Sequence, residues 1–415
     1  MEHVLTDSKK RTAFRSALAC VALGLAIGCS DTDATAVNLP GGKFAIAMRV
    51  ADSESNANTF VAFVDSLLDG PPVTLDGALE LNTREGGHSG GNLYPGHKPG
   101  AFFIYAPPAL DRYEATIDGT FRKTGALSFA AQGVTGAGSF GFIQVFSETK
   151  AYLFSNETFE IVVWNPSTMT VEKTFPIPIQ KEALPATFTF GVGQRRGNQV
   201  VFGAWFSDFE AETVLDLNYI FVVDADRDEF VGVTREERCG GIISLMTGGD
   251  GTIYLSPDVW TAAIHRLDAS RAPKPCLLRM LPGQNAPDPD YKVDLEEFTG
   301  SPFTAGLTSA GGDNAYFYVL DEETAAIDSM STANVLHGGP AWRWVHANLA
   351  SKEQRALSSN LLGGTHLSFD VGGDVITYTA AADSKESTLL KTNVSGDPQR
   401  GRVVPGVPTK IIAIR

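Results

Sequence analysis

The sequence predicts an all-β fold, a seven-bladed β-propeller of four-stranded antiparallel blades that is closed by pairing of its N- and C-terminal strands. Helical periodicity is nearly absent, and short runs rich in β-branched and aromatic residues recur instead, such as "AFFIYA", "EIVVWN" and "NAYFYVL". Two motifs repeat along the chain. The last residues, "KIIAIR" (410–415), have the pattern of one more strand, which can complete the N-terminal unit and close a ring.

The first repeated motif is a Gly-Gly-Asp turn that leads into an aromatic strand, and it starts at Gly248, Gly311 and Gly372. The second is a hairpin with Asp or Asn at its corner, a position that both residues favour because they bond their own backbone. It occurs as "VVWNPSTMTVEKTF", "FVVDADRDEFVGV", "HRLDASRAPKPCLLRM", "VHANLASKEQRAL" and "LKTNVSGDPQRGRVV". Two strand pairs make one four-stranded unit, and units stacked in a ring bury each other's faces.

Seven such units can be counted along the chain. They cover residues 43–82, 84–135, 139–180, 187–236, 241–282, 303–358 and 366–404. Their spacing is irregular, so six or eight blades stay open. An all-β sandwich is the alternative, but it needs about 100 residues per domain and gives no seven-fold repetition.

The N-terminus has the pattern of an export signal with a lipid attachment site. Four basic residues precede residues 17–28, which carry no charge and are too few for a membrane span of about 20 residues. "LAIGC", ending at Cys29, resembles a bacterial lipobox, so we expect cleavage before Cys29 and lipidation of its thiol. The expected division is a signal peptide at 1–28, a lipidated tether at 29–40 and one propeller domain at 41–415. Ser30 after the cysteine favours the outer membrane, and an ordinary secretory signal is the alternative.

The charge of the chain excludes some partners. Removing residues 1–28 takes away four basic and two acidic residues, so the formal net charge changes from −15 to −17. An acidic surface of this size argues against binding to nucleic acid or to an anionic membrane surface, although a local basic pocket stays compatible with it.

Long loops with aromatic and cationic residues define the expected working face. In a propeller, the loops that enter the first strand and those that join the second strand to the third gather on one face around the channel. Four of the five tryptophans fall in or beside such loops, where they suit a flat, anionic, aromatic ligand. The candidate ligand-binding residues are Arg84, Lys98, Trp205, Trp260, Trp342 and Arg343. The alternative for each tryptophan is that it fills a gap between blades.

No pattern in the sequence indicates a catalytic or metal centre. There is no GxSxG, HExxH or CxxC spacing, and the glycine-rich "GGDG" lies between strands, where no helix follows to hold a phosphate. The acidic stretch 288–297 lacks a calcium-loop pattern and is expected to be a solvated connection. We therefore expect a protein that is not an enzyme and holds no covalently bound cofactor and no metal ligand set.

Cys239 and Cys276 are the two cysteines that remain unmodified after cleavage at Cys29. Export permits a disulfide. On the blade map, however, Cys239 precedes an inner strand and Cys276 begins an outer one that is expected to start at the opposite face. This places their Cα atoms beyond the roughly 7 Å that a disulfide tolerates, so the map argues against a bridge but leaves it open.

The stretch "CLLRMLPGQNAPDPDYKVDL" (276–295), together with the lipobox, resembles the xenosiderophore-utilisation family of bacterial surface lipoproteins. The matching positions are Leu278, Arg279, Gly283, Asp288 and Tyr291. The resemblance implies a β-propeller, lipid-anchored at the cell surface, that binds a ferric siderophore of the catecholate class and passes it to a TonB-dependent outer-membrane receptor. No binding residue carries over from it. The competing classes are an envelope scaffold for protein–protein interaction and a propeller enzyme of lactonase or quinoprotein type.

Overall fold

The computed structural model describes residues 39–51, 57–81, 92–106, 108–135, 142–179, 186–189, 193–339, 341–355, 357, 362–363, 367–381 and 385–415. The chain divides into two compact units, Met1–Ala36 and Val37–Arg415, and all described residues lie in the second. No helix in this described part is long and apolar enough to cross a membrane.

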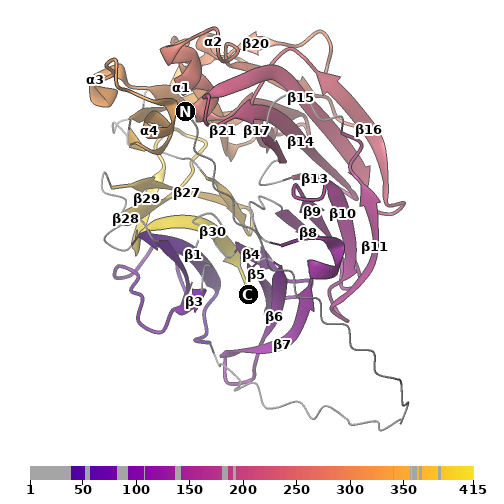
Figure 1. Cartoon of the computed structure of the whole chain (residues 1–415). Coiled ribbons are helices and arrows are strands. Elements are labelled where there is room, and N and C mark those ends of the chain that lie inside the picture. The colour runs from indigo at the N-terminus through magenta and orange to yellow at the C-terminus, as the bar shows by residue number, and fades with distance from the viewer. Residues whose placement is uncertain are drawn as a thin grey trace, which may run out of the picture. The chain divides into compact units, whose positions relative to one another are not determined.

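The strands form seven antiparallel sheets that follow one another around a ring, as the sequence predicts (Figure 1). Neighbouring blades approach each other through their first strands, for example β30 with β4 and β17 with β21, which identifies these strands as the innermost ones. From the axis outwards, blade 1 contains β30 (Val407–Ala413), β1 (Phe44–Ala51), β2 (Ala57–Val64) and β3 (Leu79–Leu81); blade 2 contains β4 (Asn92–Pro95), β5 (Ala101–Ala106), β6 (Ala109–Ala115) and β7 (Phe121–Ser128); blade 3 contains β8 (Phe142–Val145), β9 (Ala151–Ser155), β10 (Glu160–Asn165) and β11 (Thr170–Pro176).

In blade 4, two short strands pair with the second strand, and in blade 6 two short strands pair with the third. Blade 4 contains β12 (Ala186–Thr189) and β13 (Gln194–Arg196), then β14 (Gln199–Asp208), β15 (Thr213–Asp224) and β16 (Glu229–Glu236); blade 5 contains β17 (Ile242–Thr247), β18 (Ile253–Pro257), β19 (Cys276–Met280) and β20 (Val293–Asp294). Blade 6 contains β21 (Thr304–Gly311), β22 (Asn314–Leu320), β23 (Trp342–Asn348), β24 (Gln354–Arg355) and β25 (Leu362–Gly363); blade 7 contains β26 (Phe369–Val371), β27 (Asp374–Ala380), β28 (Glu386–Lys391) and β29 (Gln399–Pro405).

The C-terminal strand closes the ring, which confirms the prediction made from "KIIAIR". β30 pairs with β1 in antiparallel register, with Ile411 opposite Ile46 and Ile412 opposite Ala45 (Figure 1). Ile411 packs into the core between blades 7 and 1, and Ile412 into the core between blades 1 and 2. Both side chains are at most 3 % exposed. The closing strand therefore joins two inter-blade cores, which is where most of its hydrophobic stabilisation arises.

The predicted corner residues shape the hairpins between third and fourth strands. The side-chain oxygens of Asn165, Asp224 and Asn348 each accept hydrogen bonds from the backbone amides two and three residues later. In each of these turns the residue four positions after the corner adopts a left-handed backbone: Met169 (φ 55°), Asp228 (φ 53°) and Lys352 (φ 60°). The Asx side chain thus replaces the hydrogen bonds that the turn removes from the ladder.

One of the five expected hairpins is wrong. In "HRLDASRAPKPCLLRM" the first residues end a helix, α1 (Val259–Leu267), and Asp268 shapes the turn that follows it. Asp258 caps α1 by accepting from the amide of Trp260 at 2.7 Å. All residues from Val259 to Ile264 are buried, so the first turns of α1 are enclosed on every side. The other described helices are short: α2 (Glu296–Thr299), α3 (Glu322–Ala325), α4 (Ala333–Gly338) and the 3-10 helix η1 (Ala130–Gln132).

The acidic stretch 288–297 is not the simple solvated connection that the sequence suggested. It contains β20, the fourth strand of blade 5, and the first residues of α2. Val293 and Leu295 are buried among Leu277, Phe298 and their neighbours. Blade 5 therefore extends past residue 282, because apolar residues alternate with the acidic ones and fix the strand against β19.

Cys239 and Cys276 form a disulfide, with their Cα atoms 5.7 Å apart. The expectation that they lie at opposite faces is therefore wrong. In an antiparallel sheet the first and third strands run in the same direction, so β17 and β19 begin at the same face. Cys239 just before β17 and Cys276 at the start of β19 meet there.

Candidate functional site

The ring has two faces, which the strand connections distinguish. The connection face carries the loops that join second strands to third strands, which include residues 209–212, 258–275 and 321–341. The hairpin face, at the other ends of the strands, carries the turns 96–100, 248–252, 311–314, 372–373 and 392–398.

The tryptophans that the sequence placed on an exposed rim pack in the core instead. Trp205 and Trp260 are 3 % and 2 % exposed, and Trp342 is fully buried. The rings of Trp205 and Trp260 meet edge to face, 6.0 Å apart, and Trp342 donates from Nε1 to the Leu336 carbonyl at 2.8 Å. Trp260 lies on α1 itself, and all three rings belong to a core cluster that also contains Ala333 and Leu336 of α4. The exposed aromatic rim expected from the sequence is therefore wrong for all three residues.

The two described candidate cations lie on different faces of the ring. Arg343 is exposed at the start of β23, on the connection face beside the buried tryptophans. Lys98 lies in the β4–β5 turn on the hairpin face, where it forms an ion pair with Glu114 at 3.1 Å. The structure therefore does not bring Lys98 to the face of Arg343. Arg84 and Cys29 lie outside the described residues.

An ion pair fastens two helices on the connection face. Nε2 of His337, on α4, lies 3.2 Å from Oδ1 of Asp258, the capping residue of α1. Burial alone raises the pKa of Asp258, but the charge and hydrogen bond of His337 outweigh it and hold this pKa below its usual value. For His337, burial lowers the pKa, and the charge of Asp258 outweighs burial and raises it. The pair therefore favours the ionised form of both residues.

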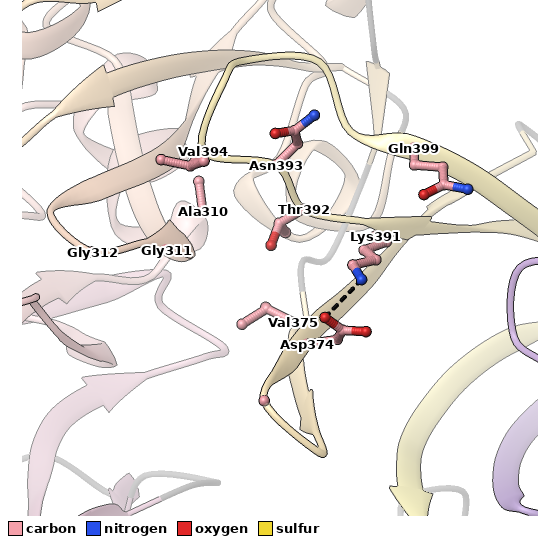
Figure 2. A pocket seen from close by; sticks show the side chains of 11 residues that line it. Ala310, Gly311, Gly312, Asp374, Val375, Lys391, Thr392, Asn393, Val394 and Gln399 are labelled. Atoms are coloured by element: carbon pink, nitrogen blue, oxygen red, sulfur yellow. Dashed lines mark ion pairs between the residues drawn. The ribbon is translucent and has the colours of Figure 1, made fainter.

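A pocket opens on the hairpin face between blades 6 and 7. Its volume is about 540 Å³, and Figure 2 shows the side chains around it. Ala310, Val375 and Val394 supply an apolar wall, and two glycine turns, Asp374 and polar groups from the β28–β29 segment supply the rest. Val394 is 56 % exposed at the rim. The remaining lining residues are Gly311, Gly312, Gly373, Asp374, Lys391, Thr392, Asn393 and Gln399.

The charged residues of this pocket are paired with each other. Nζ of Lys391 lies 2.7 Å from Oδ1 of Asp374, as the dashed line in Figure 2 marks. Below the pocket, the hydroxyl of Tyr316 donates to the carbonyl of Gly396 and fixes the β28–β29 turn. The pocket is thus open to solvent, close to neutral in charge and mixed in polarity.

A difference between two copies of the Gly-Gly-Asp motif explains why the pocket exists at this boundary. Between blades 5 and 6, Asp313 reaches across and accepts from the amide of Gly249 at 3.0 Å. Asp313 lies within its turn, whereas Asp374 follows its turn and pairs with Val371. Because of this offset, Asp374 bonds Lys391 of its own blade and does not fasten blade 7 to blade 6.

The sequence analysis missed the pocket-lining residues Lys391, Asn393 and Val394. They lie in "LKTNVSGDPQRGRVV", which was interpreted only as a hairpin corner. The available signal was the coincidence of that corner with a Gly-Gly-Asp turn in the preceding blade. Neither motif alone indicates a cavity.

The sequence matches no known protein family and no curated protein. Solved structures with a similar arrangement include a functionally unknown protein from Desulfotomaculum acetoxidans, at 10 % identity and a TM-score of 0.46, with 88 % of this chain and 100 % of that chain covered. Kuenenia stuttgartiensis hydrazine synthase is similar at 10 % identity and a TM-score of 0.45, over 72 % of this chain and 76 % of that one. Apo AztD from Citrobacter koseri is similar at 13 % identity and a TM-score of 0.40, over 89 % and 97 %. The propeller fold of the present chain follows from its own strand pairing.

Proposed function

We propose that this chain is an exported lipoprotein that captures a ferric siderophore in the pocket between blades 6 and 7 and passes it to a TonB-dependent outer-membrane receptor. The observation that carries the proposal is the pocket itself, whose volume of about 540 Å³ lies within the range of small-molecule sites. The lipobox-like segment before Cys29 and the Cys239–Cys276 disulfide support an exported location. The resemblance of residues 276–295 supplies the ligand class.

The pocket offers an anionic ligand one cation, Lys391, which Asp374 now neutralises. A ferric catecholate is a triply anionic aromatic object, so one of its oxygens has to compete with Asp374 for the ammonium group. Asp374→Asn removes that competitor and one negative charge. We expect this variant to bind a ferric siderophore about 2–5-fold more tightly, which corresponds to the ~0.5–1 kcal/mol of an exposed charge pair.

Filling the pocket is the sharper test. Val394→Trp adds a large side chain at an exposed pocket-lining position, so we expect a loss of ferric-siderophore binding in fluorescence-quenching titrations without a change in melting temperature. The matched control is Val335→Trp, at another exposed valine on α4 of the connection face, which is expected to leave binding unchanged. Arg343→Ala tests the connection face as the alternative site, and Arg84→Ala tests the other arginine that the sequence predicts to bind the ligand.

The results of these titrations distinguish whether the protein binds a ferric siderophore at all from where on the ring it binds one. Loss of binding only with Arg343→Ala keeps siderophore capture but moves it to the connection face. Absence of binding by the wild-type protein to any ferric siderophore overturns the proposal. A thermal-shift screen that includes calcium ions and a quinone cofactor then distinguishes a propeller enzyme from an interaction scaffold, because the scaffold responds to none of these small molecules.

A further inference from the structure

Two side chains of blade 6 hold the β28–β29 turn of blade 7. The hydroxyl of Tyr316, on β22, accepts from the amide of Asn393 at 3.2 Å and also lies within hydrogen-bond distance of the Asn393 and Gly396 carbonyl oxygens. Arg355, on β24, donates from Nη1 to the carbonyl of Ser395. The position of this turn is therefore set by the neighbouring blade.

The same turn forms the rim of the pocket between blades 6 and 7. Asn393 and Val394 line the pocket, and Val394 lies between the residues that blade 6 holds (Figure 2). Gly396 has a φ of 127°, and a Cβ atom there would lie 2.8 Å from Cδ of Arg355, so this side chain also packs against the turn. Arg355 is exposed, so a solvated position is open to it once its contact with Ser395 breaks.

His346, on β23, lies next to both of these side chains. It pairs with Tyr316 across one edge of its strand and with Arg355 across the other. Its ring meets the Tyr316 ring edge to face, 5.4 Å away. The residue is 3 % exposed, and neither ring nitrogen forms a hydrogen bond with a described residue. Such a group is uncommon in a protein core, because its lost hydration is not replaced.

We propose that His346 makes the rim of the pocket sensitive to pH. While its ring is neutral, Tyr316 and Arg355 hold the β28–β29 turn. Protonation places a second positive charge opposite Arg355, and like charges in this position repel each other. Arg355 then leaves Ser395 for solvent, and the turn loosens. A lower ligand affinity in acid follows from this, and that consequence alone rests on the proposed function.

The surroundings of His346 favour its neutral form. Burial is the largest cause that lowers its pKa, and the charge of Arg355 on β24 lowers it further. On β22, burial raises the pKa of Tyr316 to about 12, so the phenol stays neutral. Blade 7 contributes the apolar Leu390 of β28 to the same core, and the charge of Asp397, in the β28–β29 turn, acts on Tyr316.

The direction of the pH effect follows from this lowered pKa. The contribution of neutral His346 is present above the unfolded value of 6.5 and is lost as the pH falls through the lower folded value. When Arg355 moves into solvent, its charge no longer opposes protonation of the ring. The released form therefore takes up a proton more readily, and acid favours it.

Hydrogen exchange at two amides tests the proposal without any ligand. The amides of Asn393 and Gly396 are both hydrogen-bonded in the turn, to the Tyr316 hydroxyl and the Asn393 carbonyl. NMR of the full mature protein gives the titration midpoint of His346, assigned by the signal missing from His346→Phe. From pH 7 to one pH unit below this midpoint, we expect the protection factors, relative to intrinsic rates, to fall about 2–10-fold, the size of one hydrogen bond.

Three variants identify the cause of this change. His346→Phe keeps a ring that cannot take up a proton, so protection at pH 7 should remain and its loss in acid should disappear. His97→Phe is the matched control, at a histidine in the β4–β5 turn of blade 2, and should leave the loss in acid unchanged. Arg355→Met should lower the protection at pH 7, remove the further loss in acid and raise the midpoint of His346.

The arginine variant keeps the buried histidine, so it tests the proposal even where His346→Phe does not fold. Protection of Asn393 and Gly396 that stays constant through the midpoint of His346 overturns the proposal. An equal loss in acid in His346→Phe or in Arg355→Met overturns it as well. No ligand enters these measurements, so a failure of siderophore capture and a failure of this proposal are distinguishable.

Discussion

The guanidinium group of Arg279 holds the carboxylate of Asp288 through two nitrogens, Nε at 2.9 Å and Nη2 at 2.8 Å from the same oxygen. The guanidinium carbon also lies 4.3 Å from the centroid of the Tyr291 ring. These residues belong to the stretch that resembles the surface lipoproteins. Their side chains contact one another along the outer edge of blade 5, so the residue pattern has a structural explanation: it fixes the segment that leads from β19 to β20.

The same segment crosses to blade 4. Asn285 approaches Gly232 of β16 so closely that a Cβ atom on Gly232 would lie 2.2 Å from the Asn285 carbonyl oxygen. Arg238 donates to the Pro289 carbonyl at 2.7 Å and holds Glu236 through two nitrogens. Residues 281–292 therefore fasten two blades together on their outer side.

Removing the arginine should loosen this segment. In Arg279→Ala we expect faster backbone hydrogen exchange across 281–292, because Asp288 loses both side-chain hydrogen bonds and Tyr291 loses a cation–π contact of about 0.5–1 kcal/mol. Arg227→Ala, at a more exposed ion pair on blade 4, should leave this exchange unchanged. Equal protection in both variants would show that the arginine does not hold the segment.

The contact between Arg279 and Asp288 should also weaken in acid. The hydrogen bonds from Arg279 are the largest cause that holds the pKa of Asp288 below its usual value. Its contribution is present above the unfolded-state pKa of about 3.8 and is lost as the pH falls through the lower folded value. The exchange protection factors of 281–292, taken relative to the intrinsic exchange rates at each pH, should therefore fall below pH 4 in the wild type and depend less on pH in Asp288→Asn.

The disulfide should contribute strongly to stability, because it closes a loop between residues 37 positions apart in the sequence. From loop-closure entropy, we expect Cys239→Ser/Cys276→Ser to lower the free energy of unfolding by about 3–4 kcal/mol, measured by denaturant titration. Reducing agent should destabilise the wild type similarly and leave the double variant unaffected. Two reactive thiols in the unfolded wild type, assayed without reductant, would contradict the bridge.

The sequence was sufficient to predict the features in which a residue's structural role depends only on its own strand or turn. The closing strand could be predicted because Ile411 and Ile412 lie in an apolar run that needs a sheet, and the corners because Asn165 and Asp224 shape their own turns. The position of the two cysteines depends on which face a third strand starts from, and the pocket depends on a one-residue difference between Asp313 and Asp374. The first follows from the antiparallel order of strands within blade 5, whereas the second becomes visible only when blades 5, 6 and 7 are placed beside each other.

Changing Trp260 to alanine should lower the stability of the protein far more than changing Arg343 to alanine, although the sequence grouped both as ligand-binding residues. Trp260 is buried against Trp205 and Phe209, so Trp260→Ala should cost about 3–5 kcal/mol of stability. Arg343 is exposed, so Arg343→Ala should change stability by less than about 0.5 kcal/mol. Denaturant titration measures both, and a stable Trp260→Ala variant would argue that the ring is not part of the core.

The contact between α1 and α4 should be strongest over an intermediate range of pH. The pKa of His337 is raised, so its contribution is fully present below the unfolded value of 6.5 and is lost as the pH rises through the folded value. The pKa of Asp258 is lowered, so its contribution is present above 3.8 and is lost as the pH falls through the folded value. The exchange protection factors of 333–338, taken relative to the intrinsic exchange rates at each pH, should therefore be largest between these limits.

His337→Gln should remove the alkaline part of this dependence, because glutamine stays neutral while keeping a donor near Asp258. The ion pair between Arg266 and Glu322, which also joins α1 to the segment before α4, should persist in the variant. His265→Gln is the matched control, since His265 lies on α1 and contacts the Ala272 carbonyl and not a carboxylate. If this control abolishes the pH dependence as fully as His337→Gln does, the ion pair with Asp258 is not its cause.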